Sequence, residues 1–455
     1  MSTITPSTTT PAFIAGGLAS TLDTNSIIDG LVSLQQRPLT LLKSQQTGLQ
    51  AQISTLGSLA TRLSALGDAG RALGTSGALA VSATSSNTSF SAAPGAGAAA
   101  GSYSVQVTAL ATAAKWRTSA FGSTDTVKAG SLDIAVDGIH YPTDPTKPLA
   151  WQDGASLTDV VAAIRASGAP VSAAVLFDGQ SSYLSITKRD TGSGPLVVTE
   201  TSTGSTGRAL GVPELQTSGL DATLTVDGLP IVSSSNVITG AIPGTTLTLK
   251  SKGLDAENLT LQNDVAGTKA KLKTYVDAYN SVIQVVQQQL SPAANTDRTA
   301  SLAGSSTLRS LQQTLQAFGS QQVPGLGSIR TLADVGVKTN RDGTLSIDDA
   351  VLGSALATSP DALNSLFTTA STGIAAAVGA LTDQYVKPGT GLLALAQSGL
   401  TTRAKQMDDN ATQIQARLDA YRATLQSQFA AMEQIVSQLK NTGSFLTSQS
   451  ALNNK

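Results

Sequence analysis

Apolar side chains recur every seven residues near both ends of the chain, and this repeat constrains the fold more than any other feature. Near the C-terminus they follow two lines four positions apart, which only the polar Gln428 interrupts. The first line holds Leu400, Met407, Ile414, Tyr421 and Ile435, and the second holds Ala404, Ala411, Leu418, Leu425, Met432 and Leu439. Near the N-terminus the repeat consists of Leu42, Leu49, Leu56 and Leu63. Because an apolar period of about 3.5 residues is typical of helices that bury one seam against another helix, we predict a long coiled-coil-like helix at each end.

These heptad residues are the candidate partner interface. The predicted interface residues are Leu42, Leu49, Leu56, Leu63, Leu400, Met407, Ile414, Leu418, Tyr421, Leu425, Met432, Ile435 and Leu439. In the alternative arrangement the two helices pack antiparallel within one subunit, and both uses can coexist. The sequence leaves open whether the distal ends of the two helices are paired in the free monomer, because isolated helices are only marginally stable in water.

The N-terminal helix has clear start and break signals. Asp23 or Asn25 can cap it, and Pro38 is expected to kink or restart it. We expect it to cover residues 26–73, after a disordered segment at residues 1–20. Three glycines inside it each cost about 1 kcal/mol relative to alanine, so the helix should need a partner. They are Gly48, Gly57 and Gly67.

Between the helical ends the pattern changes to short alternating strands. Residues 132–139 and 224–229 both alternate and then turn at Asp-Gly, which is the strongest short-range hairpin signal. Residues 156–167 are predicted to form an amphipathic helix in which Ser156 and Asp159 match a capping box. Residues 332–347 are expected to form a small hairpin. Residues 74–101 are rich in serine, alanine and glycine and are expected to end in a loop around Pro94.

The predicted fold class is α+β multidomain, with terminal coiled-coil-like helices and a helical leg domain that carries a β-rich, sandwich-like head inserted in the middle of the chain. At 455 residues the chain is too long for one core. The predicted domains are a flexible N-terminal segment at 1–35, a helical leg at 36–75 and 256–400, a first β-rich head at 76–118 and 207–255, a second β-rich head at 119–206, and a C-terminal coiled-coil helix at 401–455.

Composition excludes some function classes. Only 13% of residues are charged and the net charge is −1, which argues against a nucleic-acid surface. Aromatic residues make up 4% of the chain, so core volume must come from smaller aliphatic side chains, which suits slender helical packing. Cysteine is absent, which fits either a cytosolic protein or a secreted one that does not rely on disulfides.

The N-terminal residues do not resemble a Sec signal peptide, because they lack both a basic region and an apolar core. No stretch approaches the eighteen apolar residues of a membrane span, so membrane insertion is not expected. Taken alone, these features favour the cytoplasm. Export machines that read an unfolded N-terminus leave a secreted location open.

Candidate chemistry is sparse. His140 is the only histidine, and a solvent-facing loop residue is expected there rather than a catalytic base or metal ligand. The isolated Asp-Gly pairs are interpreted as turns rather than calcium loops. Trp116, between Lys115 and Arg117, could stack on a sugar or a base, although we favour an exposed strand end. We therefore predict no enzyme activity, no cofactor and no metal.

Several motifs in order resemble one family, the bacterial flagellar filament cap protein or flagellar hook-associated protein 2. Near the N-terminus, the motifs similar to the family's signatures are Asp23-Thr24-Asn25-Ser26-Ile27-Ile28 and Gln36-Arg37-Pro38-Leu39. In the middle of the chain they are Leu157-Thr158-Asp159-Val160 and Ile242-Pro243-Gly244-Thr245-Thr246. In the C-terminal half they are Leu332-Ala333-Asp334-Val335-Gly336-Val337 and Asp342-Gly343-Thr344-Leu345-Ser346-Ile347. The similarity spans nearly the whole chain and is weakest at residues 111–150.

The resemblance implies a structural protein at the distal end of the flagellar filament, which promotes flagellin polymerisation and prevents loss of exported monomers. It also implies a homo-oligomeric ring, usually a pentamer, export through the flagellar type III apparatus with its chaperone, and an extracellular location. Two alternatives remain. One is another axial flagellar subunit, and the other is an adhesin whose head binds host mucin or glycans.

Overall fold

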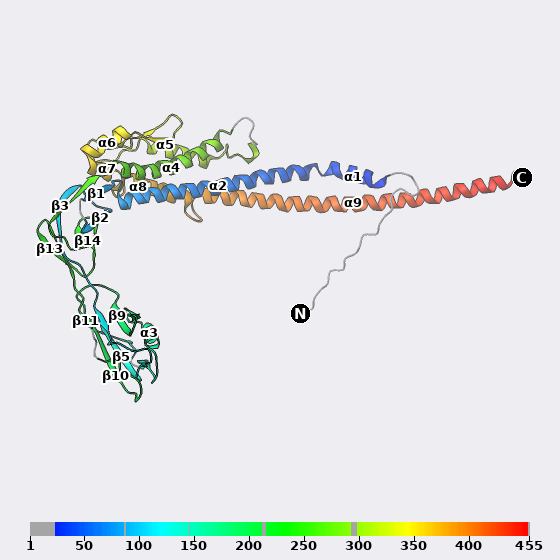
Figure 1. Cartoon of the computed structure of the whole chain (residues 1–455). Coiled ribbons are helices and arrows are strands. Elements are labelled where there is room, and N and C mark those ends of the chain that lie inside the picture. Colours follow the sequence, from blue (N-terminus) through cyan, green and yellow to red (C-terminus); the bar gives the residue numbers. More distant parts are fainter. Residues whose placement is uncertain (1–22, 86–87, 145, 212–214, 293–297, 454–455) are drawn as a thin grey trace.

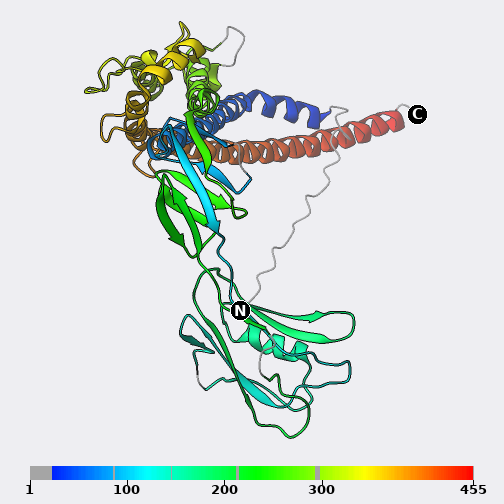
Figure 2. The same ribbon diagram turned by 60° about the vertical axis from the view of Figure 1, so that its left-hand side comes forward.

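The computed structural model describes residues 23–85, 88–144, 146–211, 215–292 and 298–453. The expected disordered segment at residues 1–20 therefore lies outside the described residues. Figure 1 shows α2 and α9 side by side as a long rod, with the β-rich part turned away from one end of it. Figure 2 shows an inner head next to the helices and an outer head beyond it. The predicted α+β fold class, with long terminal helices around a β-rich middle, is confirmed.

Three helices build the rod. α1 covers Thr24–Gln35, α2 covers Arg37–Ser76, and α9 covers Leu392–Asn453. The predicted cap and break are both present: Asp23 Oδ1 accepts a 3.1 Å hydrogen bond from the Ser26 backbone N–H, and Pro38 lies in the first turn of α2. The hydrogen bonds from the Ser26 hydroxyl and backbone hold the pKa of Asp23 below its usual value. The hydrogen bonds of the cap are therefore fully formed at a pH above this lowered pKa, and they weaken as the pH falls through it.

Shorter elements complete the helical leg around α2. They are α4 (Val265–Leu290), η1 (Arg298–Ala300), α5 (Ser306–Phe318), η2 (Ala333–Val335), β17 (Val337–Thr339), β18 (Leu345–Ile347), α6 (Asp349–Thr358), α7 (Pro360–Thr368) and α8 (Ile374–Val386). Side chains of Asp264, Ser305 and Asp348 cap α4, α5 and α6. The small hairpin expected at residues 332–347 is present as β17 and β18. One continuous apolar core joins α2, α4, α5, α7 and α8.

The inner head consists of two antiparallel sheets around one apolar core. Its strands are β1 (Val81–Ser85), β2 (Phe90–Pro94), β3 (Gly101–Ala109), β12 (Ala222–Val226), β13 (Leu229–Ser233), β14 (Val237–Ile242), β15 (Thr245–Leu249) and β16 (Glu257–Asn263). The sheet orders are β1-β16-β3-β12-β13 and β14-β15-β2. No strand was predicted within residues 74–101, but β1 and β2 lie there. They pair with β16 and β15, which are distant in sequence, so local composition did not reveal them.

The outer head contains two more sheets and one helix. Its elements are β4 (Lys115–Arg117), β5 (Gly130–Val136), β6 (Ile139–Tyr141), β7 (Leu149–Trp151), α3 (Leu157–Ala166), β8 (Val171–Phe177), β9 (Ser182–Lys188), β10 (Leu196–Ser202) and β11 (Leu215–Thr217). The sheet orders are β10-β5-β6, with β7 also on β5, and β11-β4-β9-β8. Ser156 and Asp159 form the predicted capping box of α3. Trp116 is buried in this core, so the expectation of an exposed strand end is wrong.

Both predicted Asp-Gly hairpins are present, one in each head. Asp137 and Gly138 have φ angles of 53° and 83°, and Asp227 and Gly228 have φ angles of 50° and 79°. Positive φ at both central residues matches the twist of the flanking strands. Three separate apolar cores occupy the leg, the inner head and the outer head. We propose that they correspond to separate domains, with three changes to the ranges predicted above: β16 belongs to the inner head rather than to the leg, and β4 and β11 belong to the outer head rather than to the inner one.

The glycines of α2 have a different role from the predicted one. A Cβ at Gly67 would lie 2.6 Å from Thr382 Oγ1 on α8, and a Cβ at Gly48 would lie 2.9 Å from the Thr299 carbonyl oxygen. Gly57 would meet only Gln397 Nε2, at 3.6 Å. Gly48 and Gly67 therefore allow neighbouring segments to approach α2 closely, and their cost in helix propensity is offset by this packing.

The Gly67→Ala substitution is expected to lower the free energy of unfolding by about 1–3 kcal/mol, because the added methyl group overpacks the contact with α8. The matched Gly57→Ala substitution should raise it by up to about 1 kcal/mol through helix propensity. Urea unfolding followed by far-UV circular dichroism measures both. Equal effects of the same sign would contradict the close-packing role of Gly67.

Candidate partner-binding surface of the helical leg

The heptad residues near the C-terminus, which we call the C-terminal seam, pack against the N-terminal helices along part of α9. α9 lies antiparallel to α2 and α1 (Figure 1). Four members of the second heptad line are buried there: Ala404, Ala411, Leu418 and Leu425. Three members of the first line are half-buried: Leu400, Met407 and Ile414. The predicted antiparallel alternative, with the helices packed within one subunit, therefore describes this part of the leg.

Two small apolar clusters hold the distal part of this pairing. Leu39 packs with Ala411 and Leu418, and Ile28 and Val32 pack with Leu425. Polar contacts flank these clusters. Asp29 forms an exposed ion pair with Arg422, and Gln46 Nε2 donates a 3.1 Å hydrogen bond to Asp408 Oδ1. Exposed polar contacts of this kind contribute little free energy, so the apolar clusters supply most of the stability.

The N-terminal seam is covered by the subunit itself. Leu49, Leu56 and Leu63 are buried, and Leu42 is half-buried. Leu56 and Leu63 belong to the leg core, which α4 and α8 complete. α2 buries more than one line of apolar residues because helices surround it on several sides. Leu49, Leu56 and Leu63 are therefore buried within the subunit, as in the alternative arrangement described above, and the proposed partner interface is limited to the heptad residues that remain accessible.

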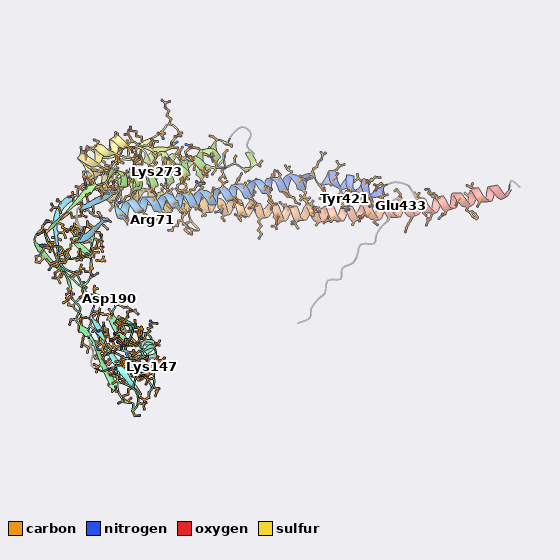
Figure 3. All side chains as sticks on the ribbon, in the orientation of Figure 1. Arg71, Lys147, Asp190, Lys273, Tyr421 and Glu433 are labelled. Atoms are coloured by element: carbon orange, nitrogen blue, oxygen red, sulfur yellow. The ribbon has the colours of Figure 1, made fainter. Side chains whose placement is uncertain are left out.

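The distal end of α9 carries exposed members of the seam. Ile435 is 57% exposed and Leu439 is 66% exposed, while Tyr421 is exposed to a lesser degree and Met432 is half-buried. The last apolar cluster along α9 ends at Phe429. Beyond it, α9 projects past the start of α1, and Tyr421 and Glu433 mark this transition in Figure 3. These heptad positions are therefore accessible to a partner in the described part of the chain.

Phe445 and Leu446 extend this exposed surface and were not among the predicted residues. Leu446 follows Leu439 by seven residues, so continuing the heptad count by one step finds it. Phe445 stands next to that line and is found only once the helix is known to continue to Asn453. Together with Ile435 and Leu439 they form what we call the distal stripe.

A groove lies beside the break between α1 and α2. It has a volume of about 510 Å³ and is lined by Gln35, Pro38, Ile414, Arg417, Leu418 and Tyr421. The break separates α1 from α2 at Gln36, and Pro38 follows in the first turn of α2. The groove brings together three predicted interface residues: Ile414, Leu418 and Tyr421.

The remaining candidates for chemistry occupy structural positions. His140 lies on β6, with Nδ1 2.7 Å from Asp133 Oδ2, and both side chains are largely exposed. Burial raises the pKa of Tyr279 to about 12, and its hydroxyl donates to the Leu315 carbonyl oxygen at 3.0 Å. Among the described residues there is no group of three or more acidic, histidine or cysteine side chains placed to hold a metal. No described helix is long and apolar enough to cross a membrane.

Comparisons with known proteins agree over most of the chain. Family models for the flagellar hook-associated protein 2 N-terminus and C-terminus match residues 20–114 and 219–441. Flagellar hook-associated protein 2 of Escherichia coli O157:H7 is 30% identical over 454 residues, which cover 95% of this chain and 97% of that protein. The A-type protein of Pseudomonas aeruginosa is 28% identical over 468 residues and covers 94% of this chain and 95% of its own.

A solved structure is also similar to this chain. The crystal structure of the D1-D2-D3 domains of the flagellar cap protein FliD from Escherichia coli is 29% identical, with a TM-score of 0.60. The match covers 76% of this chain and 99% of that one.

Leu425 and Leu439 occupy the same heptad line but differ in burial. We expect Leu425→Ala to lower the free energy of unfolding of the leg by about 2 kcal/mol, because it removes a buried contact with α1. Leu439→Ala should change it by less than about 0.5 kcal/mol. Thermal or urea unfolding of the purified monomer measures the difference. A similar loss for both would mean that the distal stripe is already buried in the free protein.

Proposed function

We propose a function for this chain from the family to which it belongs, that of flagellar hook-associated protein 2. The chain caps the distal end of the bacterial flagellar filament, promotes flagellin polymerisation and prevents loss of exported flagellin. The similar solved protein from Escherichia coli is named a flagellar cap protein. The role is structural. The comparisons give no support to the adhesin alternative, and the matching family is neither flagellin nor a junction protein.

The observation that carries the proposal is the distal stripe at the free end of a long leg. Ile435, Leu439, Phe445 and Leu446 expose apolar surface on a helix that no described segment covers. Burying one such side chain completely contributes about 1.5–3 kcal/mol. An amphipathic helix of another protein could cover this surface in the way one coiled-coil strand covers the next. We assign this partner to the terminal helices of flagellin at the growing end.

The distal end of α9 is also the part of the leg best suited to rearrange. Beyond Phe429 no described apolar cluster includes a residue of α9, and residues with few buried contacts open at low free-energy cost. We expect the cap to move from one site to the next as each flagellin subunit is added, and this movement would depend on the distal end of α9 rather than on weakening of α2 by its glycines. Gly48 and Gly67 support close packing instead.

The other predicted partners belong to the same proposal. The cap would be a homo-oligomeric ring, with a pentamer implied by the resemblance, at the extracellular tip of the flagellum. The chain would reach this place through the flagellar type III export apparatus and its chaperone. Exposed apolar side chains on both heads favour the heads as the source of ring contacts: Leu229, Val232 and Val237 on the inner head, and Leu176 and Phe177 on the outer head.

A double substitution tests the distal stripe. Ile435→Asp with Leu439→Asp should leave the monomer folded, because both side chains are exposed, but should abolish filament growth and release flagellin into the medium. The control is Gln434→Asp with Gln438→Asp, which adds the same charge at neighbouring exposed positions. Complementation of a strain that lacks this protein provides the readout. Normal filaments from the stripe variant would refute the assignment.

The source of ring formation can be tested by mass measurement. The full-length protein and a version without residues 1–40 and 410–455 should form the same oligomer if the heads supply the contacts. Native mass spectrometry or light scattering of both proteins gives their stoichiometry. Assembly of the intact chain alone would place the ring contacts on the legs.

A further inference from the structure

The outer head is joined to the inner head by two chain segments that run side by side. They meet at Thr112 and Leu220, whose backbones exchange hydrogen bonds of 2.8 and 3.1 Å. Domains connected only in this way are expected to move relative to each other, because the interface between them is small. A further contact is needed to hold the heads at one angle.

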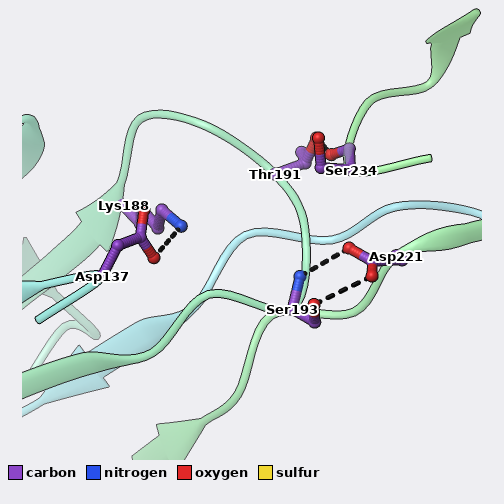
Figure 4. Close-up of polar contacts among 6 residues, drawn as sticks. All are labelled: Asp137, Lys188, Thr191, Ser193, Asp221 and Ser234. Atoms are coloured by element: carbon purple, nitrogen blue, oxygen red, sulfur yellow. Dashed lines mark hydrogen bonds and ion pairs between the residues drawn. The ribbon is translucent and has the colours of Figure 1, made fainter.

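The loop at residues 189–195 provides such a contact. It connects β9 to β10 of the outer head, yet it hydrogen-bonds the inner head. The backbone N–H and the hydroxyl of Ser193 donate to the two carboxylate oxygens of Asp221 at 2.7 and 2.8 Å (Figure 4). Thr191 Oγ1 donates to the Ser234 carbonyl oxygen at 2.6 Å. Asp221 immediately precedes β12, and Ser234 immediately follows β13, so both belong to the inner head.

The same loop also reaches the connecting segments. The Gly192 N–H donates to the Thr112 carbonyl oxygen at 3.1 Å. A Cβ at Gly219 would lie 2.0 Å from the Gly192 carbonyl oxygen, and a Cβ at Gly192 would lie 2.6 Å from Ser234 Cβ. Gly192 has a φ of 109°, a backbone conformation that residues with a side chain rarely adopt. Loop, connecting segment and inner head therefore approach at distances that only glycine permits.

The base of the loop is fixed within the outer head. Lys188 is only 6% exposed, and its Nζ lies 2.6 Å from Asp137 Oδ1 at the β5–β6 turn. The Asp137 N–H donates to the Pro195 carbonyl oxygen at 3.1 Å, which ties the end of the loop to the same turn. The Lys188 side chain is buried whereas Asp137 is half-exposed, so removing the carboxylate would leave a buried ammonium group without its partner, and the pair anchors the base of the loop. Figure 4 shows the anchor and the Ser193–Asp221 contact on the same loop.

We infer that the 189–195 loop is a latch that fixes the angle of the outer head relative to the inner head. The anchor at Asp137 and Lys188 holds one end of the latch in the outer head, and Asp221 with Ser234 receives the other. Together with the two connecting segments the latch gives a three-point attachment. The two heads consequently move as one rigid body. The latch follows from contacts within one chain and is independent of the assigned partner.

The absence of cysteine from the chain allows a direct test. Spin labels at Lys147→Cys in the outer head and Thr239→Cys in the inner head report the distance between the heads by pulsed electron paramagnetic resonance. We expect one narrow distribution in the otherwise unchanged protein. Asp221→Ala, which removes both Ser193 contacts, and Gly192→Val, which pushes the loop away from Ser234, should each broaden this distance distribution.

Amide hydrogen exchange is a second measurement. The exchange rate at Gly192 and Ser193 should increase roughly ten- to hundredfold in Asp221→Ala.

The matched control is Asp178→Ala. Asp178 accepts backbone hydrogen bonds from Gln180 and Ser181 at 2.9 and 2.8 Å, so it makes similar contacts entirely within the outer head. Its removal should leave the distance distribution unchanged. A distribution that stays narrow in both latch variants would overturn the inference, and so would equal broadening in the control. If one latch variant fails to fold, the other alone decides the outcome.

Discussion

The antiparallel packing of α9 against α2 and α1 is the interaction on which the rest of the structure depends. It brings the helices near the two ends of the chain together and leaves the residues between them to form the heads. It also divides the C-terminal seam into a buried part, which includes Leu418 and Leu425, and an exposed distal stripe. One heptad repeat thus serves both the stability of the subunit and the surface offered to a partner. The transition between the two uses occurs where α1 begins.

The heads and the leg differ in how much they can rearrange. The leg joins a firm core near the heads to an end that few contacts stabilise, so it can rearrange locally. The heads are two small sandwiches in series, each with its own apolar core. A latch between them would let the distal end of the leg move without changing the angle between the two heads. This division suits a structural protein at the tip of the flagellum, where the cap must remain closed while its contacts with the filament change.

Local signals in the sequence predicted many elements correctly. The cap at Asp23, the break at Pro38, the capping box at Ser156 and the Asp-Gly hairpins all depend on a few neighbouring residues. β1 and β2 were missed because small residues give them little pattern and their partners are distant in sequence. The burial of Trp116 and the close packing at Gly67 were missed for a related reason. A residue's own neighbours do not indicate what the rest of the fold places against it.

The candidate site was predictable in part. The heptad count found both seams, but it could not tell which residues the subunit would cover itself, because that depends on α4 and α8. The central claim is that residues 433–448 of α9 are uncovered in the free protein and covered at the filament end. Hydrogen–deuterium exchange of this segment tests it most directly. Rapid exchange in the free protein and strong protection in the cap on a filament are expected. Protection already present in the free protein, or rapid exchange in both states, would contradict the account.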